Sequence, residues 1–316
     1  MIGPHEGGRC LLAASGGGHL IELDRLATLL RLPEERTWVT FDTPQARSLL
    51  NGSEVHFAPF AGSRDPIGTA RAALWGRRFL KDNPFDIAVS TGASIAVAIL
   101  PLAAATGTHC YYVESATRTT GPSLTGHLLR PFGQINLRTQ YPNWAGPRWK
   151  YEFSVFDGFQ AVASQATELR RIVVTLGISR FGFRRLVDRL IDILPMHADV
   201  LWQVGSTDMS GLDVAYHRAL AAAELNAAIA DSDVVIAHAG VGSAITALAA
   251  GKLPVLVPRQ RRYKEHVDDH QRLLADELSG RGLAEYSDVS DLNWSTFVRA
   301  ASWQIDLSDD WLHELV

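Results

Sequence analysis

Short runs of apolar and β-branched residues alternate with amphipathic segments along the whole chain. This alternation is typical of an α/β fold with parallel sheets, because the buried strands are short and apolar while each connecting helix has one polar face. In the first half it predicts strands over 9–14, 37–41, 87–90 and 110–113, and a helix over about 19–30. In the second half it predicts strands over 172–176, 200–204, 234–237 and 254–257, and helices over 183–194, 220–230, 243–250 and 266–279.

The repetition of this pattern predicts two Rossmann-like domains, residues 1–160 and 161–290. Residues 157–168 lack clear periodicity, so the boundary is placed there. Residues 291–316 are predicted to form a C-terminal helical tail that packs back. The aromatic residues that suggest it, at roughly helical spacing, are Trp294, Phe297, Trp303 and Trp311.

Composition and charge narrow the class of protein. The 316 residues suffice for two cores, and the net charge of −4 gives no sign of a general nucleic-acid binder. Residues 1–160 carry 15 basic and 13 acidic side chains, hence +2, and residues 161–316 carry 15 and 21, hence −6. Cys10 and Cys110 have neither a disulfide pattern nor metal-ligand spacing, which fits a reducing cytosol. The longest apolar stretch is about a dozen residues against roughly 20 for a span, and no apolar leader begins the chain, so we expect a cytoplasmic protein.

Two strand-to-helix turns are rich in glycine, which lets backbone N–H groups and the positive helix end approach a phosphate. Their candidate anion-binding residues are Gly16, Gly17 and Gly18 in the first turn and Gly240, Gly242 and Ser243 in the second. Neither turn completes a dinucleotide-binding motif, because Ile21 and Ile245 stand where the third glycine is required. Asp42 ends the second strand at about the distance of a ribose-binding acid, so a nicotinamide-dependent enzyme stays open as an alternative.

A polar cluster follows the second glycine turn by some 25 residues. Carboxylates and amides bond the vicinal hydroxyls of a sugar, and this cluster supplies Glu265, Asp268, Asp269 and Gln271. The alternative is a solvated, well-capped first helical turn. His266 and His270 would share a helix face, but Val267 stands where a zinc protease has its glutamate and no third ligand is evident. We therefore expect no metal site.

Several motifs of the second half together resemble the donor-binding half of glycosyltransferases of the GT-B type that extend polyprenyl-diphosphate sugars. The segments are 174–177 (VTLG), Phe183 with 185–187 (RLV), 202–205 (WQVG), 238–243 (HAGVGS) and 265–271 (EHVDDHQ). The resemblance implies a UDP-sugar as donor substrate, no cofactor, and two Rossmann-like domains facing a cleft. The implied donor contacts are Gly205, Ser206 and His238 for the nucleotide, Gly240, Gly242 and Ser243 for the diphosphate, and Glu265, Asp268, Asp269 and Gln271 for the sugar.

The first half resembles the partner half of the same enzymes. The segments are 15–23 (SGGGHLIEL), 90–92 (STG), 112–115 (YVES), Arg118, 122–126 (PSLTG) and 140–142 (QYP). In eukaryotes the two halves are separate subunits that add the second N-acetylglucosamine to dolichyl diphosphate, and bacterial exopolysaccharide operons encode similar pairs. The resemblance implies that one chain combines both halves here. Ile178 and Arg184 depart from the family pattern, which usually has Thr and Asp there, and the partner half's membrane-anchoring helix is absent.

Transfer with inversion needs a base for the acceptor hydroxyl and a partner for the departing diphosphate. His19, at the start of the helix after the first glycine turn, is the first candidate for the base, and Glu114, at the end of a strand, is the second. Glu114 could instead pair with Arg118. The helix opened by Gly240 would stabilise the leaving group, so the chemistry demands no metal.

The acceptor is either a lipid-diphosphate-linked saccharide or a soluble small molecule. Residues 64–81 interleave the basic side chains of Arg71, Arg77, Arg78 and Lys81 with apolar ones. This pattern could place a helix on the inner face of the plasma membrane or merely describe a solvated helix. Two further hypotheses remain: an epimerase or hydrolase of UDP-sugars, and a non-catalytic scaffold for a partner transferase.

Overall fold

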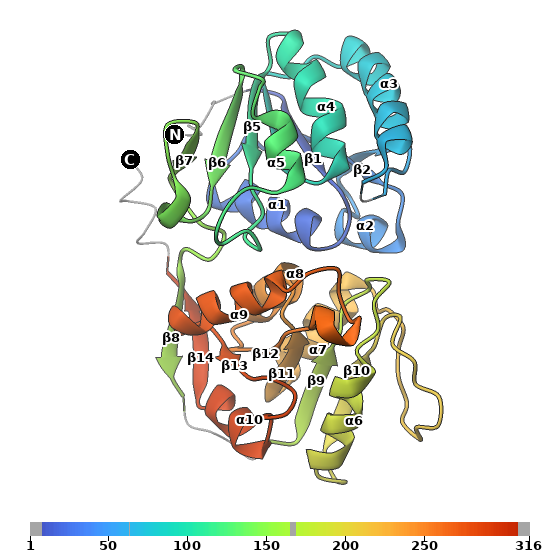
Figure 1. Cartoon of the computed structure of the whole chain (residues 1–316), viewed down its shortest axis with the longest axis vertical. Coiled ribbons are helices and arrows are strands. Elements are labelled where there is room, and N and C mark those ends of the chain that lie inside the picture. The colour runs from blue at the N-terminus through green and yellow to red at the C-terminus, as the bar shows by residue number, and fades with distance from the viewer. Residues whose placement is uncertain (1–7, 63, 165–168, 309–316) are drawn as a thin grey trace. The chain divides into compact units, whose positions relative to one another are not determined.

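A computed structural model of the chain describes residues 8–62, 64–164 and 169–308. The described residues divide into two compact units, with the boundary between Asp157 and Gly158 (Figure 1). Each unit is a parallel α/β structure, so the predicted fold class of two Rossmann-like domains is confirmed. Within the described residues no helix, the apolar α4 (Ser94–Ala105) included, combines the length and hydropathy needed to span a membrane.

The first unit is a sheet of strand order β3-β2-β1-β4-β5-β6-β7, in which every pairing is parallel. Its strands are β1 (Cys10–Ala14), β2 (Arg36–Phe41), β3 (Glu54–Ala58), β4 (Ile87–Gly92), β5 (His109–Val113), β6 (Ile135–Thr139) and β7 (Trp149–Tyr151). Its helices are α1 (Gly18–Leu29), α2 (Pro44–Leu49), α3 (Pro66–Asp82), α4 and α5 (Leu124–Leu129), with a 3₁₀ turn at Pro142–Trp144.

The core of the first unit lies between the sheet and α4, which packs on four of its strands and is drawn in teal in Figure 1. Burial of Leu11, Ala88 and Ile99 in this core follows from their positions on apolar runs. Helix α3 packs on α4, and a Cβ at Gly76 would lie 2.5 Å from Ile99 Cδ1, so this glycine sets the close approach of the two helices.

The second unit has a parallel sheet of order β10-β9-β11-β12-β13. Its elements are β9 (Arg171–Thr175), α6 (Arg184–Ile193), β10 (Asp199–Gln203), α7 (Ala222–Asp231), β11 (Val234–His238), α8 (Val241–Ala249), β12 (Val255–Val257), α9 (His270–Gly280), β13 (Glu285–Tyr286) and α10 (Trp294–Ala301), with a 3₁₀ turn at Arg261–Tyr263. Val173, Ile229, Val235 and Ala247 form part of its core.

The C-terminal tail predicted over 291–316 does contain a helix that packs back, but within the described residues it is only partly helical. Helix α10 forms and packs on the sheet of its own unit, but the chain then continues as strand β14 (Trp303–Leu307). This strand pairs antiparallel with β8 (Phe159–Ala163), inside the segment that lacked periodicity. Trp303 therefore lies on a strand, while Trp311 falls outside the described residues.

Candidate functional site

The loops at the carboxyl edge of the second sheet bring together most of the predicted donor residues. Because all strands are parallel, the segments after β9, β10, β11 and β12 emerge at the same edge. The strand order reverses direction between β9 and β11, and such a switch point is where open α/β sheets bind ligands. His238 ends β11 at this point.

Two glycines surround the imidazole of His238. A Cβ at Gly240 would lie 2.3 Å from His238 Nε2, and a Cβ at Gly177 would lie 2.6 Å from Cε1. Gly177 also has φ of 66°, which disfavours any other residue. The glycine of the second turn is therefore required for close packing against a ring as well as for access to an anion.

His238 is a neutral histidine. Burial lowers its pKa well below the ordinary value, and the nearby positive charge of Arg259 lowers it further. Its Nδ1 lies 3.5 Å from the carbonyl oxygen of Thr175 and 3.4 Å from Ser243 Oγ. A neutral imidazole has one nitrogen that donates a hydrogen bond and one that accepts, so it can contact a polar ligand without a charge of its own.

Helix α8 begins directly after Gly240, as the anion-binding hypothesis requires. No side chain caps its first turn, which contains Gly242 and Ser243. The uncapped N–H groups and the positive end of the helix dipole favour a negative ligand here. On the neighbouring β10 loop, Gly205 donates its N–H to the carbonyl of Arg218 at 3.1 Å, while Ser206 is exposed.

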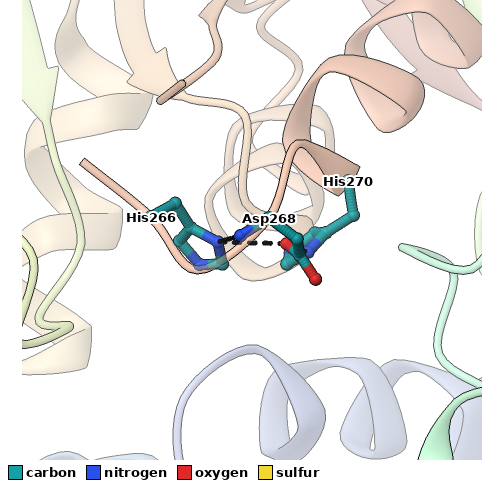
Figure 2. Close-up of side chains that lie close together, drawn as sticks. All are labelled: His266, Asp268 and His270. Atoms are coloured by element: carbon teal, nitrogen blue, oxygen red, sulfur yellow. Dashed lines mark hydrogen bonds and ion pairs between the residues drawn. The ribbon is translucent and has the colours of Figure 1, made fainter. Parts of the chain in front are cut away.

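The segment between β12 and α9 differs from its prediction. A helix was expected from 266, but α9 begins at His270, and Lys264 has a left-handed φ of 58°. His266 and His270 thus do not share a helix face. They are brought together all the same, because Asp268 Oδ1 lies 3.2 Å from His266 Nδ1 and also contacts His270 Nδ1 (Figure 2). A carboxylate that the sequence analysis linked only to a sugar therefore lies beside both imidazoles.

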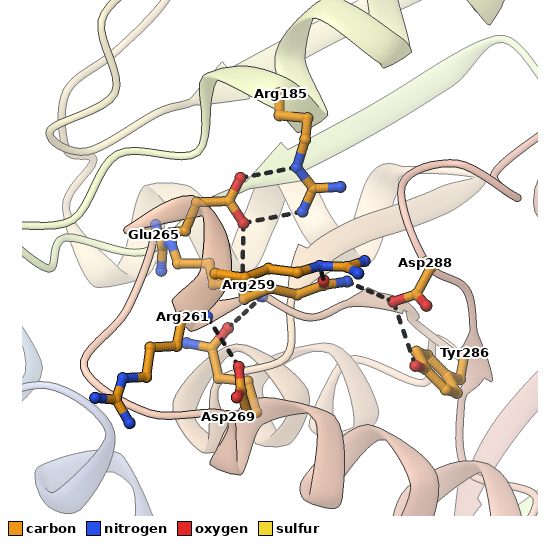
Figure 3. A network of polar contacts seen from close by, with 10 residues as sticks. Arg185, Arg259, Arg261, Glu265, Asp269, Tyr286 and Asp288 are labelled. Carbon is orange, nitrogen blue, oxygen red and sulfur yellow. Dashed lines mark hydrogen bonds and ion pairs between the residues drawn. The ribbon is translucent and has the colours of Figure 1, made fainter.

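The other residues of the predicted sugar-binding cluster hold the loop in place (Figure 3). Glu265 is buried and accepts two hydrogen bonds from Arg185, at 3.0 and 2.9 Å. Asp269 is exposed, and its Oδ1 accepts from the N–H of Arg261 at 2.8 Å. Gln271 is buried and accepts from the backbone N–H of Arg259 at 3.0 Å. These three side chains therefore fix the conformation of the loop, and of the three only Asp269 is also exposed to a ligand.

Arg259 is a residue that the sequence analysis missed. It is 1% exposed, its Nη2 donates to the carbonyls of Leu176 and Phe181 at 2.7 and 3.0 Å, and its guanidinium lies over the ring of Phe183. Burial lowers its pKa to about 10, so it stays charged at neutral pH. A basic residue two positions after a buried parallel strand was the available signal, because such positions lie at the ligand-binding edge.

The first unit has a similar switch point between β1 and β4. His19 lies in the first turn of α1, partly exposed, and a Cβ at Gly92 would lie 3.4 Å from its Cε1. The carbonyl of His19 accepts from Thr91 Oγ1 at 2.7 Å, and Ser15 donates its N–H to the carbonyl of Gly92 at 2.8 Å. The ends of β1 and β4 thus fix the backbone around His19.

The first glycine turn is less open to an anion than the second. The N–H of Gly17 donates to Gln45 Oε1 at 2.9 Å, so a side chain already satisfies it. A Cβ at Gly16 would lie 3.5 Å from Thr43 Oγ1, whereas Gly18 begins α1. Gly17 has a φ of 77°, a left-handed backbone conformation that favours glycine. The backbone conformation alone therefore accounts for glycine at this position.

Glu114 is 1% exposed at the end of β5, and its carboxylate is occupied. Oε2 accepts from the N–H and hydroxyl of Ser123 at 2.8 and 3.0 Å, and Oε1 accepts from the Tyr112 hydroxyl at 2.9 Å. Burial nevertheless raises the pKa of Glu114. Among the described ion pairs none joins Glu114 to Arg118.

A second buried carboxylate, Glu22 of α1, accepts from the N–H of Ala116 at 2.6 Å and from Gln140 Nε2. Burial raises its pKa to about 7. Because Gln140 also donates to the carbonyl of Glu114, the two carboxylates belong to one buried network behind the switch point.

Comparison with known proteins agrees with this arrangement. Residues 172–293 match the model of the glycosyltransferase family 28 C-terminal domain. The chain is similar to the solved structure of the glycosyltransferase SnogD from Streptomyces nogalater, with 19% identity, a TM-score of 0.62, and coverage of 97% of this chain and 92% of that one. It is similar to MurG of Acinetobacter baumannii, with 17% identity, a TM-score of 0.57, and coverage of 92% and 89%.

A third similar structure is the spinosyn rhamnosyltransferase SpnG complexed with thymidine diphosphate, with 15% identity, a TM-score of 0.53, and coverage of 92% and 90%. No curated protein matches the chain. The neighbours share the GT-B fold, so the resemblance noted from the sequence is confirmed at that level. With the family match, they support glycosyltransferase activity of the GT-B type.

Proposed function

We propose, from a GT-B fold whose second unit carries a glycosyltransferase family 28 C-terminal domain, that this chain transfers a hexose such as N-acetylglucosamine from a UDP-sugar to an acceptor hydroxyl, with inversion. The observation that carries the proposal is the uncapped start of α8 beside the neutral His238, at the switch point of the matched domain.

In this proposal the second unit binds the donor. The start of α8, with Gly240, Gly242 and Ser243, faces the diphosphate, because its N–H groups and dipole stabilise the charge that grows as the diphosphate leaves. Uracil and ribose lie along 204–206 and His238, and the carboxylates of the partly exposed Asp268 and the exposed Asp269 contact the sugar. The leaving group therefore needs no metal ion.

The proposed donor carries uracil as its nucleotide base. SpnG, a neighbour in fold, is complexed with thymidine diphosphate, which differs from UDP in a base methyl group and a ribose hydroxyl. The motifs of the second half favour UDP. A direct comparison of the two nucleotides distinguishes these donors.

The first unit supplies the base. His19 removes the acceptor proton as the acceptor oxygen attacks the anomeric carbon, and the bond from that carbon to the diphosphate breaks, releasing UDP. His19 is partly exposed at a switch point, whereas Glu114 is buried with both oxygens accepting hydrogen bonds. We therefore assign the base to His19 and give Glu114 a positioning role toward Ser123, the residue that caps α5.

We assign a lipid-diphosphate-linked saccharide as the acceptor, with peripheral contact to an anionic membrane. The support is a stripe on α3 in which Ile67, Arg71, Leu74 and Arg78 are all exposed and recur at helical spacing. Ile67 and Leu74 are 65% and 67% exposed, which is unusual for two aliphatic side chains one above the other. In this account one chain combines the acceptor and donor halves.

The test is a transfer assay with UDP-N-acetylglucosamine and other UDP-hexoses, using polyprenyl-diphosphate sugars in one arm and soluble phenolic or sugar acceptors in the other. We expect UDP release that depends on the acceptor, unchanged by a chelator, and a product of inverted anomeric configuration. Sugar release or epimerisation without an acceptor would replace the proposal by the hydrolase or epimerase hypothesis. Binding without any turnover would favour a scaffold.

A further inference from the structure

Two side chains of the loop before α9 and one from the first residue of α9 converge on one point (Figure 2). His266 Nδ1 and His270 Nδ1 both lie at hydrogen-bond distance from Asp268 Oδ1, and one ligand atom from each of the three residues lies within 4.8 Å of the others. The side chains are neither deeply buried nor fully exposed, at 14%, 20% and 40%. A small ion can therefore reach them.

The chemistry of this group fits a transition metal. Two imidazoles and one carboxylate form the ligand set of many zinc sites that keep a fourth position open. Metal–ligand bonds of about 2.0–2.1 Å at tetrahedral angles place the ligand atoms about 3.3 Å apart. The 3.2 Å between His266 Nδ1 and Asp268 Oδ1 is already that spacing.

We propose that His266, Asp268 and His270 bind one divalent transition-metal ion of the zinc class, with the fourth coordination position open. The proposed transfer chemistry does not use this ion, although Asp268 is assigned to both.

The surrounding contacts hold the three ligands close to this arrangement before an ion binds. On one side Glu265 accepts from Arg185 and from the N–H of Gln260, and on the other Asp269 accepts from the N–H of Arg261. The ring of His266 also packs on that of Phe181, with centroids 5.2 Å apart. Little ordering of the loop is then required on binding, which favours affinity.

Cobalt(II) titration of the full chain tests the site, because tetrahedral cobalt has intense visible absorption bands that zinc abolishes. We expect one equivalent to saturate the spectrum. His266→Ala and His270→Ala should each weaken binding by about 100-fold or more, since loss of about 2.7 kcal/mol corresponds to that factor. His56→Ala, which removes a partly exposed histidine paired with Glu54 in the first unit, is the matched control and should bind as wild type.

Asp268→Asn provides a second variant should either alanine substitution prevent folding. No saturable cobalt or zinc binding by the wild-type chain would overturn the proposal. So would unchanged affinity in the His266 and His270 variants.

A second consequence rests on the proposed function, because Asp268 is also assigned to the donor sugar. An ion that engages this carboxylate should compete with the donor, so zinc should raise the apparent KM for the UDP-sugar. His270→Ala should keep its turnover without zinc and lose the zinc effect. Equal zinc sensitivity in wild type and His270→Ala would contradict the metal site, whereas absence of turnover in both without zinc would contradict the proposed function instead.

Discussion

At the residue scale, His19 and His238 have matching places in the two units. His238 ends a central strand at a switch point and His19 lies in the turn of helix that follows one. Each has a glycine at or just after the end of the neighbouring strand against its ring, Gly92 for His19 and Gly177 for His238. Burial and a cationic neighbour keep His238 neutral, which suits ligand contact rather than proton transfer. His19, partly exposed, is the better placed of the two to accept a proton from a substrate.

Replacement of His19 by alanine is expected to lower kcat by about 10²–10⁴-fold, because general-base catalysis contributes that much. UDP affinity should stay within about twofold, since the donor residues lie in the other unit. Steady-state kinetics and calorimetry measure the two effects, with His56→Ala as the control. A parallel loss of turnover and UDP affinity would argue against the assignment of the base.

Glu22→Gln should change how stability depends on pH. The folded-state pKa of Glu22 is about 7, above the ordinary 4.5, so the unfolded state loses this proton first as the pH rises. The contribution of protonated Glu22 to the free energy of unfolding is fully present below about pH 4.5. It is lost as the pH rises through about 7, and the loss amounts to up to about 3 kcal/mol. Urea unfolding from pH 4.5 to 7.5 should therefore show a steeper decline for wild type than for Glu22→Gln. Equal slopes, with the exposed Glu35→Gln as reference, would contradict the buried, protonated Glu22.

At the element scale, the turn between β11 and α8 requires glycine at position 240 because there is no room for a side chain, and not because of the backbone conformation. Its φ and ψ of −97° and 139° are open to any residue, but a Cβ would meet the His238 ring. The requirement for glycine is thus specific to the neighbouring imidazole.

Gly240→Ala is expected to displace His238 and to weaken UDP binding by about tenfold or more, a loss of about 1.4 kcal/mol. The folded state should lose about 1–3 kcal/mol through overpacking. Gly280→Ala in α9 is the matched control, because a Cβ there meets nothing within 4 Å. If both variants bound UDP as wild type does, the turn would not be part of the donor site.

The sequence predicted the elements whose pattern is local. Strand β11, the glycine turn and α8 follow one another within 16 residues. The apolar run favours the strand, the glycines favour the turn, and the helix-forming residues favour the helix, so each element follows from its own local sequence. The late start of α9 was not predictable from the local pattern. Glu265 and Asp269 accept hydrogen bonds from the backbone N–H groups of Gln260 and Arg261, which precede them in the chain, instead of capping a helix at 266. Strand β14 was missed for a similar reason, since its partner β8 lies about 140 residues earlier.

The same distinction applies to the candidate site. Residues that a glycine-rich strand-to-helix motif contains, such as His19 and His238, were found. Arg259 was missed, because its importance comes from carbonyls at 176 and 181 that only the fold brings to it. Asp268 was assigned to a sugar alone, because its contact with two histidines depends on the course of a non-helical loop.

At the scale of the whole molecule, the charge difference between the halves and the exposed stripe on α3 favour the first unit as the part that meets an anionic surface. Each basic residue near such a surface contributes about 1 kcal/mol. Reversal of two charges, in Arg71→Glu with Arg78→Glu, should lower binding to vesicles rich in anionic lipid by more than about tenfold.

Sedimentation with vesicles measures this effect, and Arg31→Glu with Lys150→Glu, two exposed positions elsewhere in the unit, makes the same change in net charge. Equal losses in the two double variants would point to net charge rather than to the stripe. No vesicle binding by the wild-type chain would favour a soluble acceptor.

The central claim is that the second unit binds a nucleoside diphosphate at the start of α8, and calorimetric titration of the full chain with UDP and thymidine diphosphate tests it most directly. The account predicts saturable binding of one UDP per chain, tighter than that of thymidine diphosphate, retained in His19→Ala and Gly280→Ala and weakened in Gly240→Ala. Absence of binding to either nucleotide would contradict it.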